Sequence, residues 1–209
     1  MSATERFDKA ASTWDLQDRR VLIARGVTMA IAGRIPLSKE LSVLDFGCGT
    51  GLVTLALGPQ VGSITGADTS RGMLDTLAEK AKNAGIPVHL RQLEVDGSAD
   101  LGGPYDLIVS SMTLHHVADV PGLFRQFEHV LAHGGHVALA DLDVEDGTFH
   151  EDTTGVHHHG FQREQIQAWL VEAGFREIHL ETATVTSKEG KDYPIFLATA
   201  QRGWRNDWL

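Results

Sequence analysis

The sequence predicts an α/β protein with a largely parallel sheet and helices on both faces. Short apolar runs alternate with helical patterns along most of the chain, and the run at residues 105–111 is apolar at its centre, as in a strand buried on both faces. Such alternation implies right-handed crossovers between parallel strands. No helical pattern separates the last two strand-like runs, so we expect one of them to run antiparallel at the sheet edge.

The first half of the chain supplies an N-terminal helix and three strands. Apolar residues recur at helical spacing from Leu16 to Ile35 and stop before Pro36. Strands are predicted at residues 42–47, 63–68 and 88–95. A helix precedes the third strand, with Ser70 as its N-cap and Gly85 as its stop.

The second half continues the alternation and then breaks it. A fourth strand at residues 105–111 is followed by a helix that we expect to stop at Gly134 and Gly135, and a fifth strand spans residues 135–141. A helix is predicted from Arg163 to Ala173. Two strand-like runs follow, which brings the count to seven.

Composition limits the classes of function. The 209 residues favour a single domain, in which residues 1–36 form a helical cap. A formal charge of −10 disfavours nucleic-acid and membrane partners. No signal peptide or membrane-spanning run is evident, and the single cysteine suits a reducing compartment, so we expect a cytoplasmic protein.

A glycine-rich loop, DFGCGTG, joins the first strand to its helix at residues 45–51. Glycines there allow a sharp turn and the close approach of an anionic, nucleotide-like ligand. A dinucleotide fingerprint would need a third glycine at the position of Leu52, which argues against NAD. Asp68, at the end of the second strand, is placed to accept both hydroxyls of a ribose.

The segments VLDFGCGTG, GADTSRGML and YDLIVSSMTLHHV, in this order, resemble the class I S-adenosylmethionine-dependent methyltransferases. The resemblance covers nearly the whole chain. It implies a doubly wound, Rossmann-like, seven-stranded mixed sheet whose last strand is antiparallel. S-adenosylmethionine would then be the cofactor.

The resemblance also assigns cofactor-binding roles. It implies that the first-strand loop holds the methionine end, that Asp68 holds the ribose, and that neighbouring side chains flank the adenosine, line the methyl-transfer cavity or close over the cofactor. Either Glu94 or Asp96 would meet the adenine amino group, and the register between them stays open. The full predicted set is Trp14, Asp45, Gly47, Cys48, Gly49, Asp68, Thr69, Met73, Glu94, Asp96 and Ser110.

The stretch ADLDVEDGTFHEDTTGVHHHGF, at residues 140–161, follows the fifth strand and contains six acidic residues, four histidines and no lysine or arginine. Ligands of open α/β sheets bind outside the carboxyl ends of the strands, so we expect residues 142–160 to roof the acceptor pocket. A histidine oriented by a carboxylate could act as a base. We select His116, His158 and Asp141 for this role, while packing or capping competes for His115 and His116. A metal site is the weaker alternative, because no strict ligand motif is present.

Three functions therefore compete. The favoured one is a methyltransferase, monomeric or homodimeric, that acts on a small-molecule acceptor. An acidic rim would suit a cationic or neutral acceptor. The others are a sensor that binds S-adenosylmethionine or its demethylated product, and, less favoured, an NAD-dependent oxidoreductase.

Overall fold

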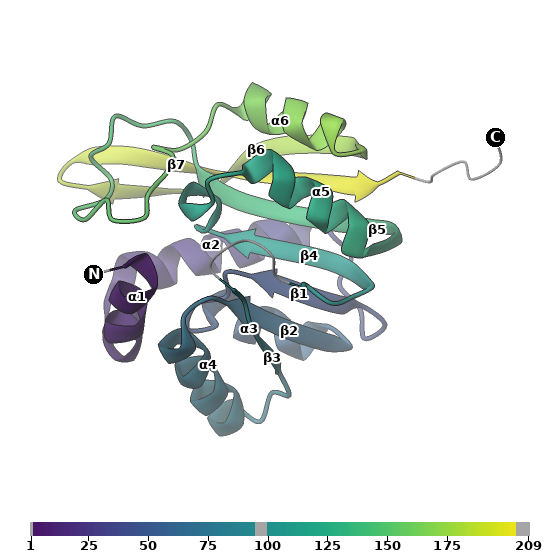
Figure 1. Cartoon of the computed structure of the whole chain (residues 1–209), viewed down its shortest axis with the longest axis horizontal. Helices are drawn as coiled ribbons and strands as arrows, with labels where there is room; N and C mark the ends of the chain where they lie inside the picture. Colours follow the sequence, from purple (N-terminus) through teal and green to yellow (C-terminus); the bar gives the residue numbers. More distant parts are fainter. Residues whose placement is uncertain (1, 95–99, 204–209) are drawn as a thin grey trace.

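The computed structural model describes residues 2–94 and 100–203, which form a seven-stranded sheet with the strand order β3-β2-β1-β4-β5-β7-β6. Figure 1 shows helices on both faces of this sheet. The strands are β1 (Ser42–Phe46), β2 (Ser63–Asp68), β3 (His89–Gln92), β4 (Tyr105–Ser111), β5 (Leu131–Leu142), β6 (Phe175–Lys188) and β7 (Lys191–Arg202). The helices are α1 (Ala3–Ala10), α2 (Asp18–Arg34), α3 (Leu52–Leu57), α4 (Arg71–Ala84), α5 (Val120–Val130) and α6 (Arg163–Glu172), with short 3-10 turns η1 (Ala11–Leu16), η2 (Gly58–Gln60) and η3 (Leu114–His116).

The two faces of the sheet carry separate cores, because side chains alternate across each strand. On β4, Leu107 and Val109 face the core that includes Val27 of α2, whereas Ile108 faces the core that includes Phe124 of α5. A smaller cluster joins Cys48 to α4 through Leu77. The sheet is therefore clamped between α2 and α3 on one face and α5 and α6 on the other, which leaves the carboxyl ends of its central strands open.

The predicted fold class is confirmed, with one correction to the topology. The last strand, β7, is antiparallel as predicted, but it pairs with both β5 and β6 and so lies inside the sheet, where β6 forms the edge. Burial explains the order: residues Ile195–Ala200 are almost entirely buried, whereas exposed and half-buried residues alternate along β6. The more apolar strand takes the position that is covered on both sides.

Element boundaries differ from the prediction in three places. The N-terminal helix is preceded by α1 and η1, which the apolar periodicity did not reveal. Strand β3 is shorter than predicted. Strand β5 begins at Leu131, so the glycine pair at 134 and 135 lies inside the strand rather than ending the helix. The Ser70 N-cap and the left-handed Gly85 C-cap of α4 are as predicted.

Candidate active site

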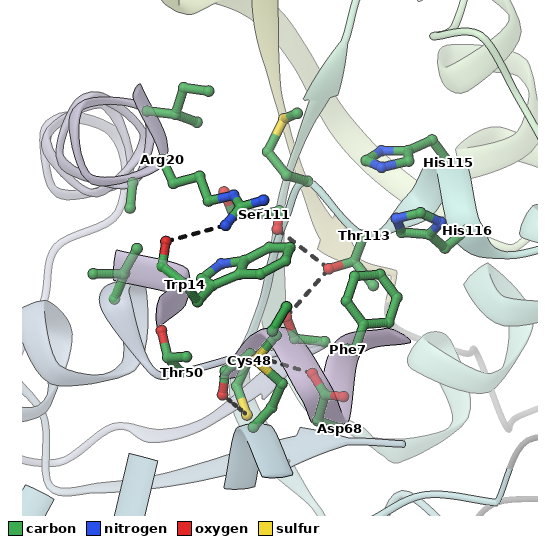
Figure 2. A pocket seen from close by; sticks show the side chains of 18 of the residues that line it. Phe7, Trp14, Arg20, Cys48, Thr50, Asp68, Ser111, Thr113, His115 and His116 are labelled. Atoms are coloured by element: carbon green, nitrogen blue, oxygen red, sulfur yellow. Dashed lines mark hydrogen bonds between the residues drawn. The ribbon is translucent and has the colours of Figure 1, made fainter. Parts of the chain in front are cut away.

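A cavity of about 470 Å³ opens at the carboxyl ends of β1, β2 and β4. We call its two parts the glycine-loop half and the histidine half. The glycine-loop half comprises residues 45–50, Asp68, Thr69 and Met73. The histidine half comprises Arg19, Arg20, His115, His116, Phe149 and His150. Figure 2 shows Cys48 and Asp68 at one end of the cavity and His115 and Arg20 at the other, with Ser111 and Thr113 between the ends.

The glycine loop is shaped by positions that tolerate no side chain. Gly47 has a φ of 70°, and a Cβ there would lie 2.2 Å from a side-chain carbon of Thr113. Gly51 has a φ of 83°, and its Cβ would meet Leu77 at 2.2 Å. Positive φ values favour glycine, and both close contacts exclude a Cβ as well. The loop is therefore fixed against β4 on one side and α4 on the other.

Two carboxylates face this loop. Asp68 accepts hydrogen bonds from the backbone N–H groups of Gly49 and Ser70, each at 2.9 Å, and burial raises its pKa. Asp45 is 1% exposed and accepts a hydrogen bond from the Thr54 hydroxyl at 2.6 Å. Burial raises the Asp45 pKa to about 7. Both carboxylates are therefore poised to gain from a cationic or hydrogen-bond-donating ligand.

A histidine–aspartate pair lies in the histidine half. Asp141, at the end of β5, is fully buried and lies 2.7 Å from Nδ1 of His115. It also accepts N–H bonds from the backbone of His115 and Leu142. Burial alone would raise the Asp141 pKa, but the His115 charge and these hydrogen bonds lower it. An ionised Asp141 that accepts a hydrogen bond from Nδ1–H keeps the proton on Nδ1 and leaves the lone pair of the ring on Nε2 of His115.

Two further histidines flank this pair. The ring centroids of His116 and His150 lie 4.2 and 4.6 Å from that of His115. Burial, followed by the neighbouring His115, lowers the pKa of His116 to about 3 and that of His150 to about 4. His116 is anchored by Nδ1 to the Gly155 carbonyl at 2.7 Å, whereas the buried Nε2 of His150 has no hydrogen-bond partner among the described residues. Both rings are therefore neutral at neutral pH.

The N-terminal residues close the remaining side of the cavity. Trp14 and Phe7 make an edge-to-face contact at 5.6 Å, and Phe7 contacts His116. Two aspartates hold this cap over the glycine-loop half: Asp8 accepts hydrogen bonds from Ser70 and Gly72 at the start of α4, and Asp15 accepts them from Thr50 and Lys80. The cap is thus attached to the elements that shape the loop.

The predicted site residues are partly brought together. The cavity is lined by Trp14, Asp45, Gly47, Cys48, Gly49, Asp68, Thr69, Met73 and His116. Among the rest, Ser110 is buried and donates to the Phe46 carbonyl, while its neighbour Ser111 lines the cavity. Glu94 is exposed away from the lining, and Asp96 lies outside the described residues.

The two remaining predicted catalytic residues lie outside the lining. Asp141 sits behind His115. His158 contacts the Val117 carbonyl through Nε2 and packs on Phe161. The Asp141 carboxylate therefore orients His115, whereas the histidines selected from the sequence were His116 and His158.

The loop at residues 142–160 contributes Phe149, His150, Glu151 and Asp152 to the lining. Its backbone docks on η3, where the His115 carbonyl accepts from residues 157 and 158. Most of its acidic side chains have other partners: Asp143 binds Arg163, Asp146 binds Lys191 and Asp152 binds Arg6. The acidic rim expected from composition is thus largely neutralised within the protein.

Sequence reasoning missed three arginines of the lining, Arg6, Arg19 and Arg20. Their signal is weak, because basic side chains at the start of a surface helix are ordinary. Within residues 2–94 and 100–203, no group of three or more His, Cys, Asp or Glu side chains is arranged to hold a metal ion. No helix of the described chain is long and apolar enough to cross a membrane.

A family model described as a methyltransferase domain matches residues 16–180, which is most of the chain. The chain belongs to the class I S-adenosylmethionine-dependent methyltransferases. The matched range contains all the residues that define the two halves of the cavity. The first 15 residues of the cap lie outside it.

Two curated relatives and one solved structure of this methyltransferase family illustrate the similarity. An uncharacterized methyltransferase of Schizosaccharomyces pombe is 33% identical over 57% of this chain and 48% of its own length. A ubiquinone biosynthesis O-methyltransferase of Rhizobium johnstonii is 30% identical over 49% of this chain and 42% of its own length. The chain thus spans less than half of either relative.

Magnesium protoporphyrin IX methyltransferase from Synechocystis, solved with bound S-adenosylhomocysteine, has a TM-score of 0.68 at 18% identity. The alignment covers 90% of this chain and 86% of that one, and it supports the fold.

Proposed function

We propose that this protein transfers the methyl group of S-adenosylmethionine to a small-molecule acceptor. The observation that carries the proposal is the two-part cavity. A glycine loop with one buried and one half-buried carboxylate, suited to a cationic nucleoside, faces His115 across one cavity, and Asp141 orients His115 from behind. The similar proteins support a small acceptor, because they include enzymes named for ubiquinone biosynthesis and for magnesium protoporphyrin IX methylation.

In the proposed donor complex, Asp45 meets the amino group of the methionine end and Asp68 accepts the ribose hydroxyls. Each carboxylate oxygen has two lone pairs, so Asp68 can accept these hydroxyls while keeping its bonds to Gly49 and Ser70. Trp14 and Met73 pack against the cofactor. We retain Glu94 and Asp96 as alternatives for the adenine contact.

The methyl group then moves by in-line displacement. The acceptor heteroatom forms a bond to the methyl carbon, and the electrons of the breaking bond return to sulfur, which becomes a neutral thioether. Alignment and exclusion of water supply much of the acceleration. We assign the acceptor's departing proton to Nε2 of His115, with Asp141 as the residue that positions the ring. Burial lowers the pKa of His116 to about 3, which makes this residue a poor base at neutral pH. His158 stays a predicted catalytic residue.

The donor assignment is tested by calorimetric titration with S-adenosylhomocysteine and with NADH. We expect binding of the first only. Asp68→Ala should weaken S-adenosylhomocysteine binding by at least about 30-fold, since a buried acceptor of charge-assisted hydrogen bonds is lost. Asp75→Ala, on the exposed side of α4, is the matched control and should leave the affinity unchanged. Failure of the wild-type protein to bind S-adenosylhomocysteine would refute the proposed function.

We further propose a single domain spanning residues 1–209, with residues 1–36 as its cap, in a cytoplasmic protein that is monomeric or homodimeric and does not bind nucleic acid. The acidic composition and the single, buried cysteine support these assignments. Light scattering of the purified chain measures the oligomeric state directly.

A further inference from the structure

Two neighbouring arginines at the start of α2 face the cavity. Arg20 stacks over the Trp14 ring, 3.4 Å from its centroid, and donates from Nη1 to the Trp14 carbonyl at 3.1 Å. Arg19 lies over the Phe149 ring, 5.0 Å from its centroid. Both side chains are partly buried. Among the described residues, neither guanidinium forms an ion pair with a carboxylate, so both charges are available to a ligand.

Two nearby acids, Asp15 and Glu151, offset part of the charge of Arg20, but neither forms an ion pair with it among the described residues. Asp15 binds Thr50 and Lys80. Glu151 is 85% exposed, and its carboxylate lies 3.9 Å from Nζ of Lys188. The charge of the histidine half is therefore carried by the arginines, because His116 and His150 are neutral.

Holding two guanidinium groups together without an ion-paired carboxylate is unfavourable. The Arg20 pKa is lowered by burial and then by the like charges of Arg19 and Arg6. An anionic ligand would remove this repulsion and satisfy the free N–H donors. The planar guanidinium matches a carboxylate in particular, since two parallel N–H groups can bind its two oxygens.

The position of these charges relative to the chemistry defines the ligand. Figure 2 shows the Arg20 side chain entering from one wall and His115 and His116 from the opposite wall. Between Arg19 and His115 the wall is formed by Phe149 and His150, which contact each other at 4.9 Å. A molecule that spans the two walls therefore meets cationic donors at one end, rings along its middle and the basic Nε2 at the other end.

We propose that the methyl acceptor is a carboxylic acid with an apolar, aromatic body, whose carboxylate is bound by Arg19 and Arg20 while its reacting heteroatom faces His115. This rests on the proposed function and specifies its substrate class. It replaces the cationic or neutral acceptor expected from the acidic loop. The carboxylate of the cofactor's methionine end is a second source of the same chemical group, so the experiment must separate the two.

The test uses S-adenosylhomocysteine-saturated protein and matched pairs of probes. Each pair joins an acid to its primary amide: benzoate, 4-hydroxybenzoate, phenylacetate, cinnamate and indole-3-acetate with the corresponding amides. Calorimetry measures all pairs on the wild type and on the Arg19→Gln and Arg20→Gln variants. Arg25→Gln, on the exposed side of the same helix, is the matched control.

We expect at least one acid to bind about tenfold or more tightly than its amide. Each of the two cavity variants should reduce this preference at least fivefold, while Arg25→Gln preserves it and the affinity for S-adenosylhomocysteine stays within twofold. The absence of any acid preference across the panel overturns the proposal, as does a preference that survives both variants.

A third outcome also overturns it. If Arg19→Gln weakens S-adenosylhomocysteine binding in the absence of acceptor, this arginine serves the cofactor's carboxylate instead; Arg20→Gln is not used for this comparison, because Arg20 also supports Trp14. The titration with S-adenosylhomocysteine is performed first on the wild type, so failure of the proposed function is seen before any acid is added.

Discussion

The two halves of the cavity are built in opposite ways. The glycine-loop half comes mainly from one strand–loop–helix segment and the end of the adjacent strand β2, which are neighbours in both sequence and space. The histidine half is assembled from α2, η3 and the loop after β5, which are distant in sequence. The first half follows from local backbone geometry, whereas the second depends on how far-separated segments pack together.

The halves also differ in how burial acts on their ionisable groups. In the glycine-loop half, burial raises the pKa of Asp45 to about 7, which favours the neutral acid. In the histidine half, burial lowers the pKa of His116 and His150, which favours the neutral base. Burial thus reduces charge on both sides, and the arginines remain as permanent charges.

The largest effect is expected on kcat, from substitutions that change the histidine half alone. His115→Gln and Asp141→Asn should each lower kcat by about 100- to 1000-fold, because the oriented base is lost. Affinity for S-adenosylhomocysteine and the melting temperature serve as checks on folding. His129→Gln, at an exposed histidine of α5, is the control. A fall in donor affinity that matches the fall in kcat would contradict the separation of the two halves.

The next largest effect is expected on stability, from substitutions in the glycine-loop half. Gly47→Ala should lower the free energy of unfolding by about 2–4 kcal/mol, because it combines a positive φ with a clash against Thr113. Gly49→Ala has a similar φ but open space around its Cβ, so about 1 kcal/mol is expected. Urea denaturation of both variants measures the difference. Equal losses would show that the contact with Thr113 is unimportant.

A smaller effect depends on pH. An ionised Asp45 binds a cationic amino group best, and its fraction grows as pH rises through the pKa of about 7. Affinity for S-adenosylhomocysteine should therefore rise about tenfold between pH 6 and pH 8. Asp45→Asn should bind more weakly and remove this dependence. Calorimetry in buffers with different ionisation enthalpies would detect the accompanying proton release, and a flat wild-type profile would contradict the assignment.

The smallest effect concerns the cap. Asp8→Ala removes the bonds to Ser70 and Gly72 and should speed dissociation of S-adenosylhomocysteine about two- to fivefold, since exposed polar contacts contribute little. Lys9→Ala, exposed on the same helix, is the control. Stopped-flow displacement provides the rates. An unchanged rate in Asp8→Ala would mean that the cap does not limit release.

The sequence predicts those parts of the fold and of the site that depend on residues close together in the chain. The glycine loop, the Ser70 N-cap and the strand alternation each follow from short-range rules, and the structure contains all three. The interior position of β7 depends on which strand is buried on both faces, so it emerges only when the whole sheet is assembled.

The choice of histidine illustrates the same limit within the site. Adjacent residues such as His115 and His116 are equivalent in the sequence, but the 3-10 turn aims one at Asp141 and the other at Gly155. The charge of the loop after β5 was misleading for a related reason, because its carboxylates are neutralised by arginines and lysines from distant strands and helices.

The stack of Arg20 on Trp14 makes the cavity observable by fluorescence. Indole emission responds to a cation held against the ring, and this cation is one of the two groups proposed to bind the carboxylate of the acceptor. Trp169 packs on Phe161, away from the cavity lining. An emission change on ligand addition that disappears in Trp14→Phe would therefore report occupancy in real time, and the protein would carry its own sensor for screening acceptors.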